Sequence, residues 1–354
     1  MAAGTVQSFQ VQWHLTEQCN LRCRHCYQSG SGRDAVLGFA EAAGVLDEIG
    51  DALASWSDLY GLSFERELSL TGGEPLLWPD LQRLVEACAS SGFRVSILTN
   101  GTLLDRKAAQ ALAAAGTAAV QVSLEGPRDV HDKVRGNGTF ERALEGVEHL
   151  LAAGLPVTLN ATLSRLNAPR MGELLELARH LGVPRLGFSR LVPSGRGESM
   201  RESSCDPEEL FALYSRMAET ARQGEVELVT SDPLAMLLLD PPEALGTEGG
   251  DHGDVPVGGC AAGVSGLTIM PDLTLLPCRR LAIPLGNLRT DSLREIWAAS
   301  PLLCALRDRS SYQGACRECR LWAVCRGCRA VAHAVAGDPL AEDHGCIRAR
   351  RQSA

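Results

Sequence analysis

Hydrophobic and polar residues alternate near the start of the chain and then recur at helical spacing. Between Phe9 and Leu15 every second residue is apolar, which is the period of a strand with one buried face. Later segments carry apolar residues three or four positions apart and indicate amphipathic helices. Further strands are expected at 67–70, 94–98, 119–124, 157–162 and 185–190. Helices are expected at 39–54, 79–90, 105–115, 139–153 and 171–181.

Strands and helices alternate through the first two thirds of the chain. A sixth helix is expected to begin at Asp206, because Asp206 can cap it, Pro207 fits its first turn and Glu209 completes the cap. Alternation of this kind places a parallel sheet beneath a layer of helices. The fold class is therefore α/β, and six strand–helix units fit a partial (β/α)6 barrel.

The composition changes between Asp240 and Gly259, where six glycines and three prolines occur within twenty residues. This composition indicates a linker or loop, and His252 within it is expected to be exposed to solvent. Beyond it lies a probable hairpin at 266–270 and 273–277. The expected division of the chain is a barrel at 1–235, a linker at 236–259, and a small cysteine-rich domain of a hairpin and short helices at 260–354.

Composition excludes several classes of protein. No apolar run reaches the roughly 18 residues of a membrane span, and the first ten residues lack the features of a signal peptide. The net charge of −9 gives no support to a nucleic-acid partner. Thirteen cysteines in a chain without a secretion signal argue for metal or redox chemistry rather than disulfides, and for a cytoplasmic location.

Three cysteines, Cys19, Cys23 and Cys26, follow the first strand within a short loop. Soft sulfur ligands suit an iron–sulfur cluster, and a [4Fe–4S] cube has four irons to ligate. Three ligands therefore leave one iron open to a group that is not protein. A partial zinc knuckle or a set of reduced thiols is the alternative.

The C-terminal region holds a second array of cysteines. Its paired C-x2-C units are strong metal signals, and their number is too large for one zinc ion and fits two clusters better. Structural zinc is the alternative. The array consists of Cys260, Cys278, Cys316, Cys319, Cys325, Cys328 and Cys346. The cysteines outside both groups, Cys88, Cys205 and Cys304, are expected to be small buried residues on helices.

Polar residues gather where the expected strands end, and in parallel barrels the chemistry lies at this edge. After the second strand, Gly72 and Gly73 permit close backbone approach, and Glu74 can accept a hydrogen bond from an ammonium group. Arg135, beyond the fourth strand, suits a carboxylate, although a salt bridge that anchors the loop is the alternative role.

The C-x3-C-x2-C loop followed by Gly-Gly-Glu-Pro resembles the radical S-adenosylmethionine (radical SAM) enzymes, and the C-terminal array resembles their SPASM domain. The resemblance implies a partial barrel, SAM chelated to the open iron of a [4Fe–4S] cluster, and two auxiliary [4Fe–4S] clusters. The SAM-side residues that it implies are His25, Tyr27, Gly72, Gly73, Glu74, Pro75, Asn100, Ser123, Glu125, Arg135 and Arg190. The metal ligands that it implies are Cys19, Cys23, Cys26, Cys260, Cys278, Cys316, Cys319, Cys325, Cys328 and Cys346.

Several positions depart from the family patterns. Glu125 stands where aspartate is usual, and the spacing of Cys325 and Cys328 is one residue short. Leu273 replaces a glycine, and because leucine avoids positive φ, a different turn is expected in the hairpin. One auxiliary cluster would take Cys316, Cys319, Cys325 and Cys346. The other would take Cys260, Cys278 and Cys328, and its fourth position is open to substrate, or filled by Asp254, Cys304 or Cys205.

The resemblance implies reductive cleavage of SAM to a 5′-deoxyadenosyl radical, which abstracts a hydrogen atom from the substrate, with an electron supplied by a flavodoxin or ferredoxin. The first expectation is oxidative modification of a ribosomally made peptide or protein, aided by a separate leader-binding protein. Radical oxidation of a small metabolite, such as a sugar, aminocyclitol or tetrapyrrole, is the second. A non-catalytic electron-transfer or binding protein is the third. Arg279 and Arg280 disfavour formylglycine formation and suit a carboxylate-bearing substrate.

Overall fold

Seven parallel strands and a C-terminal hairpin share one sheet in the computed structural model, which describes residues 6–28, 37–224, 226–239 and 254–352. The strand order is β10-β9-β8-β1-β2-β3-β4-β5-β6-β7, so β10 and β7 form its two edges and the barrel is not closed. The strands are β1 Val6–His14, β2 Ser63–Thr71, β3 Arg94–Thr99, β4 Ala119–Ser123, β5 Val157–Leu163, β6 Arg185–Arg190, β7 Glu227–Thr230, β8 Gly266–Ile269, β9 Thr274–Leu276 and β10 Gly286–Asn287.

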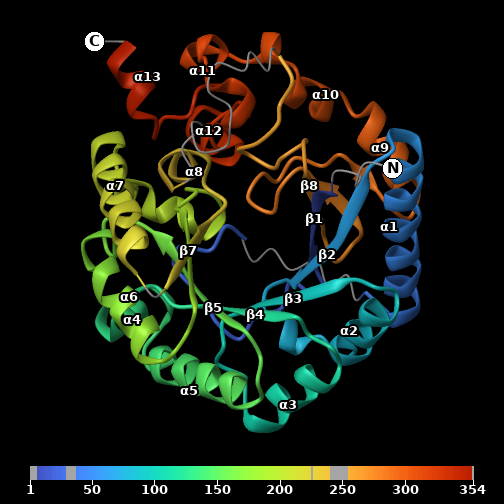
Figure 1. Ribbon diagram of the computed structural model, residues 1–354, viewed down its shortest axis with the longest axis vertical. Coiled ribbons are helices and arrows are strands. Elements are labelled where there is room, and N and C mark those ends of the chain that lie inside the picture. The colour runs from blue at the N-terminus through green and yellow to red at the C-terminus, as the bar shows by residue number, and fades with distance from the viewer. Residues whose placement is uncertain (1–5, 29–36, 225, 240–253, 353–354) are drawn as a thin grey trace.

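Helices surround the strands on the outside, and the C-terminal segment occupies the side between α7 and α1 (Figure 1). The barrel helices are α1 Phe39–Tyr60, α2 Leu81–Ser90, α3 Arg106–Ala114, α4 Arg128–Arg135, α5 Thr139–Ala152, α6 Met171–His180, α7 Pro207–Gln223 and α8 Pro233–Leu239. The C-terminal helices are α9 Leu293–Ala299, α10 Pro301–Arg307, α11 Gly314–Glu318, α12 Arg329–Ala336 and α13 Ile347–Gln352. No described helix is long and apolar enough to cross a bilayer.

The alternation along each strand decides which side chains face the helices and which face the barrel interior. In β5, Leu159 and Ala161 are buried in the hydrophobic core, whereas Asn160 and Thr162 line the central cavity. In β4, Gln121 and Ser123 likewise line the cavity, while their neighbours join the core. A strand of period two thus supplies one apolar face for packing and one polar face for a site.

The partial barrel predicted from the alternating pattern is confirmed, with additions that include strand β7 and helices α4 and α8. Strand β7 pairs in parallel with β6 and was not expected, because it is only 4 residues long. Helix α4 was not expected either, because its 8 residues bury only Val130, His131 and Val134. The predicted linker begins within α8, and residues 240–253, which include His252, lie outside the described part of the chain.

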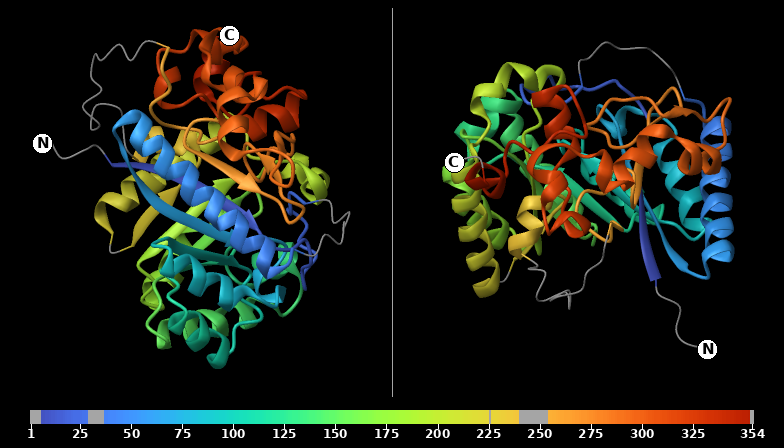
Figure 2. Two further views of the ribbon diagram at one scale, coloured as in Figure 1. Left: turned by 90° about the vertical axis from the view of Figure 1, so that its right-hand side faces the viewer. Right: turned by 90° about the horizontal axis from the view of Figure 1, so that it is seen from above.

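The hairpin of the C-terminal region extends the barrel sheet. Strand β8 pairs in parallel with β1, from Gln10 with Gly266 to Trp13 with Ile269, and β9 then turns back antiparallel to β8. A Cβ at position 266 would come within 2.8 Å of the Gln10 carbonyl oxygen, so glycine permits this close approach. Figure 2 shows the hairpin lying against the blue N-terminal strand.

The expectation of a different turn at Leu273 is wrong, because this residue takes the left-handed conformation with φ of 64°. Its side chain is only 2% exposed within the core, and its N–H donates to the Met270 carbonyl oxygen at 2.8 Å. The left-handed conformation costs roughly 1–2 kcal/mol, and burial of a leucine side chain contributes about 1.5–3 kcal/mol. Burial therefore offsets the backbone strain that glycine would avoid.

The strain predicts an unusual order of stability at this position. Leu273→Ala loses the buried side chain and keeps a Cβ in the left-handed region, whereas Leu273→Gly loses the side chain and relieves the strain. We expect both variants to be destabilised, with the alanine variant less stable than the glycine variant by about 1 kcal/mol. Thermal unfolding of the two proteins measures the difference, and an alanine variant more stable than the glycine variant would contradict the assigned turn.

Candidate active site

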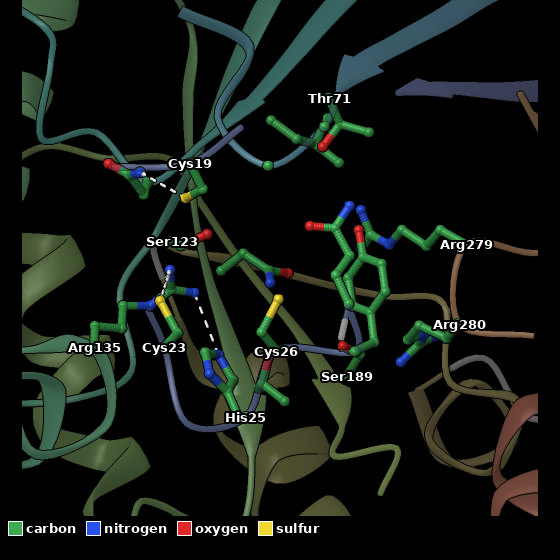
Figure 3. A pocket seen from close by; sticks show the side chains of 18 of the residues that line it. Cys19, Cys23, His25, Cys26, Thr71, Ser123, Arg135, Ser189, Arg279 and Arg280 are labelled. Carbon is green, nitrogen blue, oxygen red and sulfur yellow. Dashed lines mark hydrogen bonds between the residues drawn. The ribbon is translucent and has the colours of Figure 1, made fainter. Parts of the chain in front are cut away.

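A cavity of about 950 Å³, counting the part open to solvent, lies at the carboxyl ends of the barrel strands. Its wall is shared between the strand ends, the loop after β1 and the residues that follow β9 (Figure 3). Asn100, Ser123 and Arg190, which the sequence placed at this edge, all line it.

The three cysteines of the first loop meet at this cavity. Cys19, Cys23 and Cys26 all line it, and the loop backbone is fixed at both ends. The Arg24 N–H donates to the Val134 carbonyl at 2.9 Å, and the Gly197 N–H donates to the Cys26 carbonyl at 2.9 Å. Neighbouring segments of the barrel thus hold the loop in a shape that turns its sulfurs inward.

Gly72 and Gly73 are required because the cysteine loop packs directly on them. The Gly73 N–H donates to the Thr16 carbonyl oxygen at 2.7 Å. A Cβ on Gly73 would collide with the Gln18 backbone, and one on Gly72 would come within 2.5 Å of the Thr16 carbonyl oxygen. The glycines therefore admit backbone rather than side chain, and they form part of the cavity wall.

Glu74 lies behind this wall rather than in it. Its carboxylate accepts hydrogen bonds from the Thr99 hydroxyl at 2.7 Å and from the Asn100 N–H at 2.8 Å, and its side chain caps the short 3-10 helix that begins at Pro75. Burial raises the pKa of Glu74 although these bonds oppose the shift. The structure thus shows Glu74 joining the ends of β2 and β3, which fixes the position of the two glycines.

Glu125 holds a charged group together beneath the cysteine loop. Its Oε1 lies 2.6 Å from Arg135 Nη2 and 3.0 Å from His25 Nε2, and its Oε2 accepts from the Thr162 N–H at 2.8 Å. Burial alone would raise the pKa of Glu125, but His25 and Arg135 outweigh it and hold the pKa well below its usual range. The glutamate, only 1% exposed, is therefore ionised and anchors both the Arg135 and the His25 side chains.

Arg135 has two functions in this arrangement. Its Nη1 lies 3.8 Å from the Cys23 sulfur, while Nε and Nη2 donate to Glu125. The side chain also lines the cavity. The loop-anchoring salt bridge is thus present, and the guanidinium still faces the space where a ligand carboxylate would lie.

Tyr27, which follows the last cysteine of the loop, lines the cavity and contacts a buried histidine. Its hydroxyl lies 3.4 Å from His14 Nε2, and Gln28 Nε2 lies 3.1 Å from His14 Nδ1. Burial and the Arg279 charge lower the pKa of His14 to about 3, so this histidine is neutral. The Arg279 guanidinium lies 5.8 Å from the centre of the Tyr27 ring.

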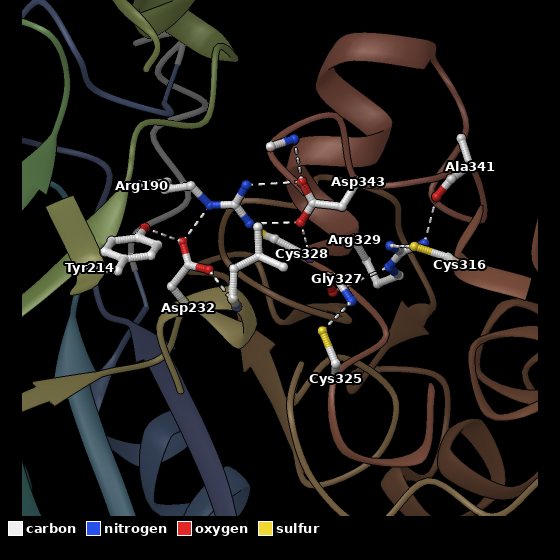
Figure 4. A network of polar contacts seen from close by, with 12 residues as sticks. Arg190, Tyr214, Asp232, Cys316, Cys325, Gly327, Cys328, Arg329, Ala341 and Asp343 are labelled. Atoms are coloured by element: carbon white, nitrogen blue, oxygen red, sulfur yellow. Dashed lines mark hydrogen bonds and ion pairs between the residues drawn. The ribbon is translucent and has the colours of Figure 1, made fainter. Parts of the chain in front are cut away.

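Arg190 lines the cavity but is largely occupied by acids. Its Nη1 and Nη2 donate to the two carboxylate oxygens of Asp343 at 2.9 and 2.7 Å, and its Nε donates to Asp232 (Figure 4). Asp343 lies in the C-terminal region and also accepts the Cys328 N–H at 2.7 Å. The Tyr214 hydroxyl donates to Asp232 at 2.9 Å. This buried network joins β6 to the cysteine-bearing loops.

The C-terminal cysteines fall into two groups. We call the first the distal set, because it surrounds a hollow away from the main cavity, and the second the proximal set, because its hollow shares Arg279 and Arg280 with that cavity. The distal set is Cys316, Cys319, Cys325 and Cys346. The proximal set is Cys260, Cys278 and Cys328.

A left-handed turn sends two neighbouring cysteines to different sets. Between Cys325 and Cys328, Arg326 has φ of 60° and Gly327 has φ of 61°. A Cβ on Gly327 would come within 2.6 Å of the Asp343 Cβ, so the second position requires glycine. The left-handed turn at Arg326 and Gly327 therefore directs Cys325 to the distal set and Cys328 to the proximal set. It does so although the Cys325–Cys328 spacing is one residue shorter than in the family pattern.

The candidates for a fourth proximal ligand lie elsewhere. Asp254 is exposed and pairs with Arg309 at 3.3 Å, and Cys205 lines a different hollow beside α7. Cys304 is exposed on α10, so the expectation that it is buried is wrong, whereas Cys88 is buried on α2 as expected. Among the described residues around the proximal hollow there is no fourth Cys, His, Asp or Glu.

The donor sets suit clusters better than single ions. In the described part of the chain no three His, Cys, Asp or Glu side chains are spaced to hold one metal ion. Thiolates around a single zinc would lie about 4 Å apart, given a Zn–S bond of about 2.3 Å. A [4Fe–4S] cube spreads its cysteines around a larger core. Sulfur-only sets of this kind are typical ligands of iron–sulfur clusters.

Several functional residues had little or no signal in the sequence. No local pattern indicates a role for Asp343, because its partner Arg190 lies 153 positions away in the sequence. Arg326 and Arg329 were not separated from the other arginines, which dominate the basic residues throughout the chain. His14 followed from the strand pattern only as a polar position. Gly195 and Gly197 did carry a signal, because two glycines flank Arg196 just beyond a predicted strand. Both pack against the backbone of the cysteine loop.

The Arg190–Asp343 pair predicts a large loss of stability when one charge is removed. Asp343→Leu leaves Arg190 with only Asp232, and we expect the apparent free energy of unfolding to fall by about 3–5 kcal/mol. Unfolding by urea measures this loss. The matched control combines Arg190→Met, Asp343→Leu and Asp232→Asn, so that no buried charge loses its partner, and should recover most of the loss. Strictly additive effects of the three changes would contradict the pairing.

Comparison with known proteins agrees with this geometry. The Radical SAM superfamily model matches residues 13–178, and an iron–sulfur cluster-binding domain model (SPASM) matches residues 260–320. An AdoMet-dependent heme synthase of Methanosarcina barkeri is 33% identical over 95% of both chains. The mycofactocin maturase MftC of Mycobacterium ulcerans is 31% identical over 96% of this chain and 87% of its own.

A solved structure shows the same fold. The structure of anSMEcpe with bound AdoMet has a TM-score of 0.73 and covers 98% of this chain and 95% of its own, at 16% identity. At this identity the likeness concerns the fold alone. The chain therefore belongs to the radical SAM superfamily, and its C-terminal region is an iron–sulfur cluster-binding SPASM domain.

Proposed function

We propose that this radical SAM enzyme oxidises a carboxylate-bearing side chain of a tetrapyrrole. In this proposal Cys19, Cys23 and Cys26 hold the SAM-binding cluster, and the distal and proximal sets hold two auxiliary clusters. Residues 1–235 form the barrel domain and 260–354 the auxiliary domain. Because thiolates for clusters need a reducing compartment, we also propose a cytoplasmic location.

The observation that carries the proposal is the charge of the cavity wall. Among the residues that the structure describes, the lining includes five arginines and no aspartate or glutamate. Arg135 is bound to Glu125, Arg190 is bound to two aspartates, and Arg196 donates to the Cys23 carbonyl at 3.2 Å. Arg280 donates to the Arg190 carbonyl and lies beside the proximal cysteines. A carboxylate ligand would thus enter a wall of cations.

Arg279 is the arginine best placed to receive that carboxylate. Among the described residues it has no acidic partner within 4.0 Å, and its guanidinium stands over the Tyr27 ring. A guanidinium can bind a carboxylate through two parallel hydrogen bonds. Figure 3 shows the Arg279 side chain reaching into the cavity.

The position of Arg279 also places a substrate between two metal centres. Tyr27 follows Cys26 directly and Arg279 follows Cys278 directly, so their contact joins the loop of the SAM-binding cluster to the loop of the proximal set. A carboxylate held by Arg279 would lie near both. Bound SAM and its cluster supply the radical that removes a hydrogen atom from the substrate.

The remaining steps balance if an auxiliary cluster accepts one electron. An auxiliary cluster, when bound, would supply the acceptor for the one electron that the substrate must lose after the hydrogen atom is removed. The cationic centre is neutralised by loss of carbon dioxide from the carboxylate or of a proton from a neighbouring carbon. The role of Arg279 is to hold the carboxylate, and the role of Arg135 and Ser123 is to orient SAM.

The tetrapyrrole is placed before the peptide that the sequence favoured. Tetrapyrroles of biological origin carry carboxylate side chains, which match the cationic wall. The heme synthase relative matches over nearly the whole length of both chains. The expectation of a peptide substrate came from the resemblance, because SPASM domains are common in peptide maturases. The charge of the cavity wall becomes visible only in the structure.

Oxidation of a ribosomally made peptide is the second candidate. The mycofactocin maturase relative favours it, and a terminal or side-chain carboxylate of a peptide would suit Arg279 equally well. A leader-binding partner belongs to this candidate alone. Both candidates require an external electron donor of the flavodoxin or ferredoxin type.

An anaerobic assay distinguishes the two candidates. Reconstituted protein is mixed with SAM, dithionite and either iron coproporphyrin III, its methyl ester, or a panel of peptides encoded beside the gene. We expect 5′-deoxyadenosine and a mass change in the free-acid porphyrin, with none in the ester. Turnover of a peptide without turnover of the porphyrin would overturn the tetrapyrrole proposal, and turnover of the ester would overturn the role of the carboxylate.

Arg279 gives a matched pair of variants. Arg279→Gln removes the charge, and we expect the KM for the carboxylate substrate to rise at least tenfold, which corresponds to about 1.4 kcal/mol. Arg279→Lys should lose less, because it keeps the charge without the fork. Cleavage of SAM in the absence of substrate should be unchanged in both. A normal KM in the glutamine variant would remove Arg279 from the substrate site.

The division between clusters predicts different effects on SAM cleavage. Cys23→Ala removes a ligand of the proposed SAM-binding cluster, and we expect 5′-deoxyadenosine formation to be abolished. Cys319→Ala removes a ligand of the distal set, and we expect part of the uncoupled cleavage to remain. Chromatographic quantification of 5′-deoxyadenosine measures both. Equal loss in two folded variants would contradict separate roles for the two cysteine groups.

A further inference from the structure

We propose that Arg280, Arg326 and Arg329 are the counter-charges of the auxiliary clusters and adjust these clusters to accept electrons. This inference rests on the proposed cluster binding but is independent of the identity of the substrate. It assigns a function to three arginines that form no ion pair with an aspartate or glutamate in the described part of the chain. Each of them instead lies beside cysteine residues of the two sets.

Arg329 belongs to the distal set. It is 0% exposed, and its Nη2 lies 3.6 Å from the Cys316 sulfur, as Figure 4 shows. Its Nη1 donates to the carbonyl oxygens of Pro339 and Ala341 at 3.0 and 2.7 Å. The carbonyl bonds fix the guanidinium in place, but they do not neutralise its charge.

Arg326 lies between the two sets. It is 2% exposed and donates through Nη2 to the Cys260 carbonyl of the proximal set. It follows Cys325 of the distal set directly and lines the distal hollow. Its Nε has no hydrogen-bond partner among the described residues. The left-handed backbone at this position brings the side chain inward rather than to solvent.

Arg280 belongs to the proximal set. It lines the hollow shared with Cys278 and Cys328, and its Nε has no partner in the described part of the structure. Since Arg280 also lines the main cavity, it stands between the substrate space and the proximal cysteines.

An unpaired buried charge is costly, and the fold avoids this cost elsewhere. Arg190, which is buried as Arg326 and Arg329 are, is paired with two aspartates, and Arg135 is paired with Glu125. Burying a charged group without a partner costs several kcal/mol. Cysteine thiolates bound to iron–sulfur cores bring negative charge to the two hollows, and this charge supplies the missing partner. The arginines are therefore stabilised when the clusters are present.

Fixed positive charges next to a cluster favour its reduced state, because reduction adds one electron to the core. Hydrogen bonds to the sulfurs and net charge are among the factors that set cluster potentials. Arg329 and Arg326 act on the distal set, and Arg326 and Arg280 act on the proximal set. Both clusters are thereby adjusted to take an electron from an oxidised substrate rather than to give one.

The test is a potentiometric titration of the reconstituted full-length protein without SAM or substrate, followed by electron paramagnetic resonance. In Arg329→Gln the charge is lost, and we expect the reduction equilibrium of one auxiliary cluster to shift at least tenfold toward the oxidised state, or about 59 mV for one electron. Arg280→Gln should shift the other auxiliary signal. Iron and acid-labile sulfide are measured in each protein, so that a potential is compared only between fully loaded samples.

Lysine variants separate charge from structure. Arg329→Lys keeps the charge and loses the two carbonyl bonds. We expect the equilibrium constant for reduction of its cluster to stay within about threefold of the wild-type value. Unchanged potentials in both fully loaded glutamine variants would overturn the proposal. If the glutamine variants lose their clusters, restored iron and sulfide in the lysine variants support the counter-charge. Loss in the lysine variants as well would show a structural role and overturn it.

The outcome is distinguishable from failure of the proposed function. A wild-type protein without acid-labile sulfide would end the cluster assignment itself. A wild-type protein with normal clusters that turns over no tetrapyrrole would leave the potentials measurable. The titration then decides the function of the three arginines on its own.

Discussion

The parallel pairing of β8 with β1 is the interaction on which the site depends. Strand β1 leads into the loop of Cys19, Cys23 and Cys26, and β8 begins the hairpin that leads through β9 into Cys278. Strand β9 then returns antiparallel to β8, so Cys278 lies beside β1, with Gln10 and Gln12, and not beyond the carboxyl end of β8. A single ladder of backbone hydrogen bonds thus holds the segment of Cys278 against the strand that leads into the first cysteine loop. The contact between Tyr27 and Arg279 is the visible consequence.

Much of this arrangement follows from local sequence pattern. The alternation in β1, β4 and β5 predicts the strands, and the same alternation decides which polar residues enter the cavity. The cysteine spacings and the glycines at 72 and 73 predict where metal-binding loops lie, because their chemistry is local. These features need no knowledge of distant partners, which is why the sequence alone was sufficient for them.

What the sequence did not indicate depends on contacts between distant segments. The carboxylate of Glu74 accepts hydrogen bonds from Thr99 and Asn100 of the next strand. Arg190 lines the cavity and is also bound by Asp343 from the C-terminal region. Both sets of partners are remote in sequence, so no local pattern indicated them. Leu273 shows the converse, because tertiary burial overrides a local backbone preference.

Arginines carry out different tasks in this protein because their partners differ. A carboxylate partner makes Arg190 and Arg135 structural anchors, and the absence of an acidic partner within 4.0 Å leaves Arg279 available to a ligand in the described cavity. Sulfur neighbours make Arg280, Arg326 and Arg329 dependent on the clusters. The same dependence explains why buried arginines and cysteines occur together in the C-terminal region. If these arginines are stable only beside a negatively charged cluster, the folding of the C-terminal region depends on the same clusters that would accept electrons from the substrate.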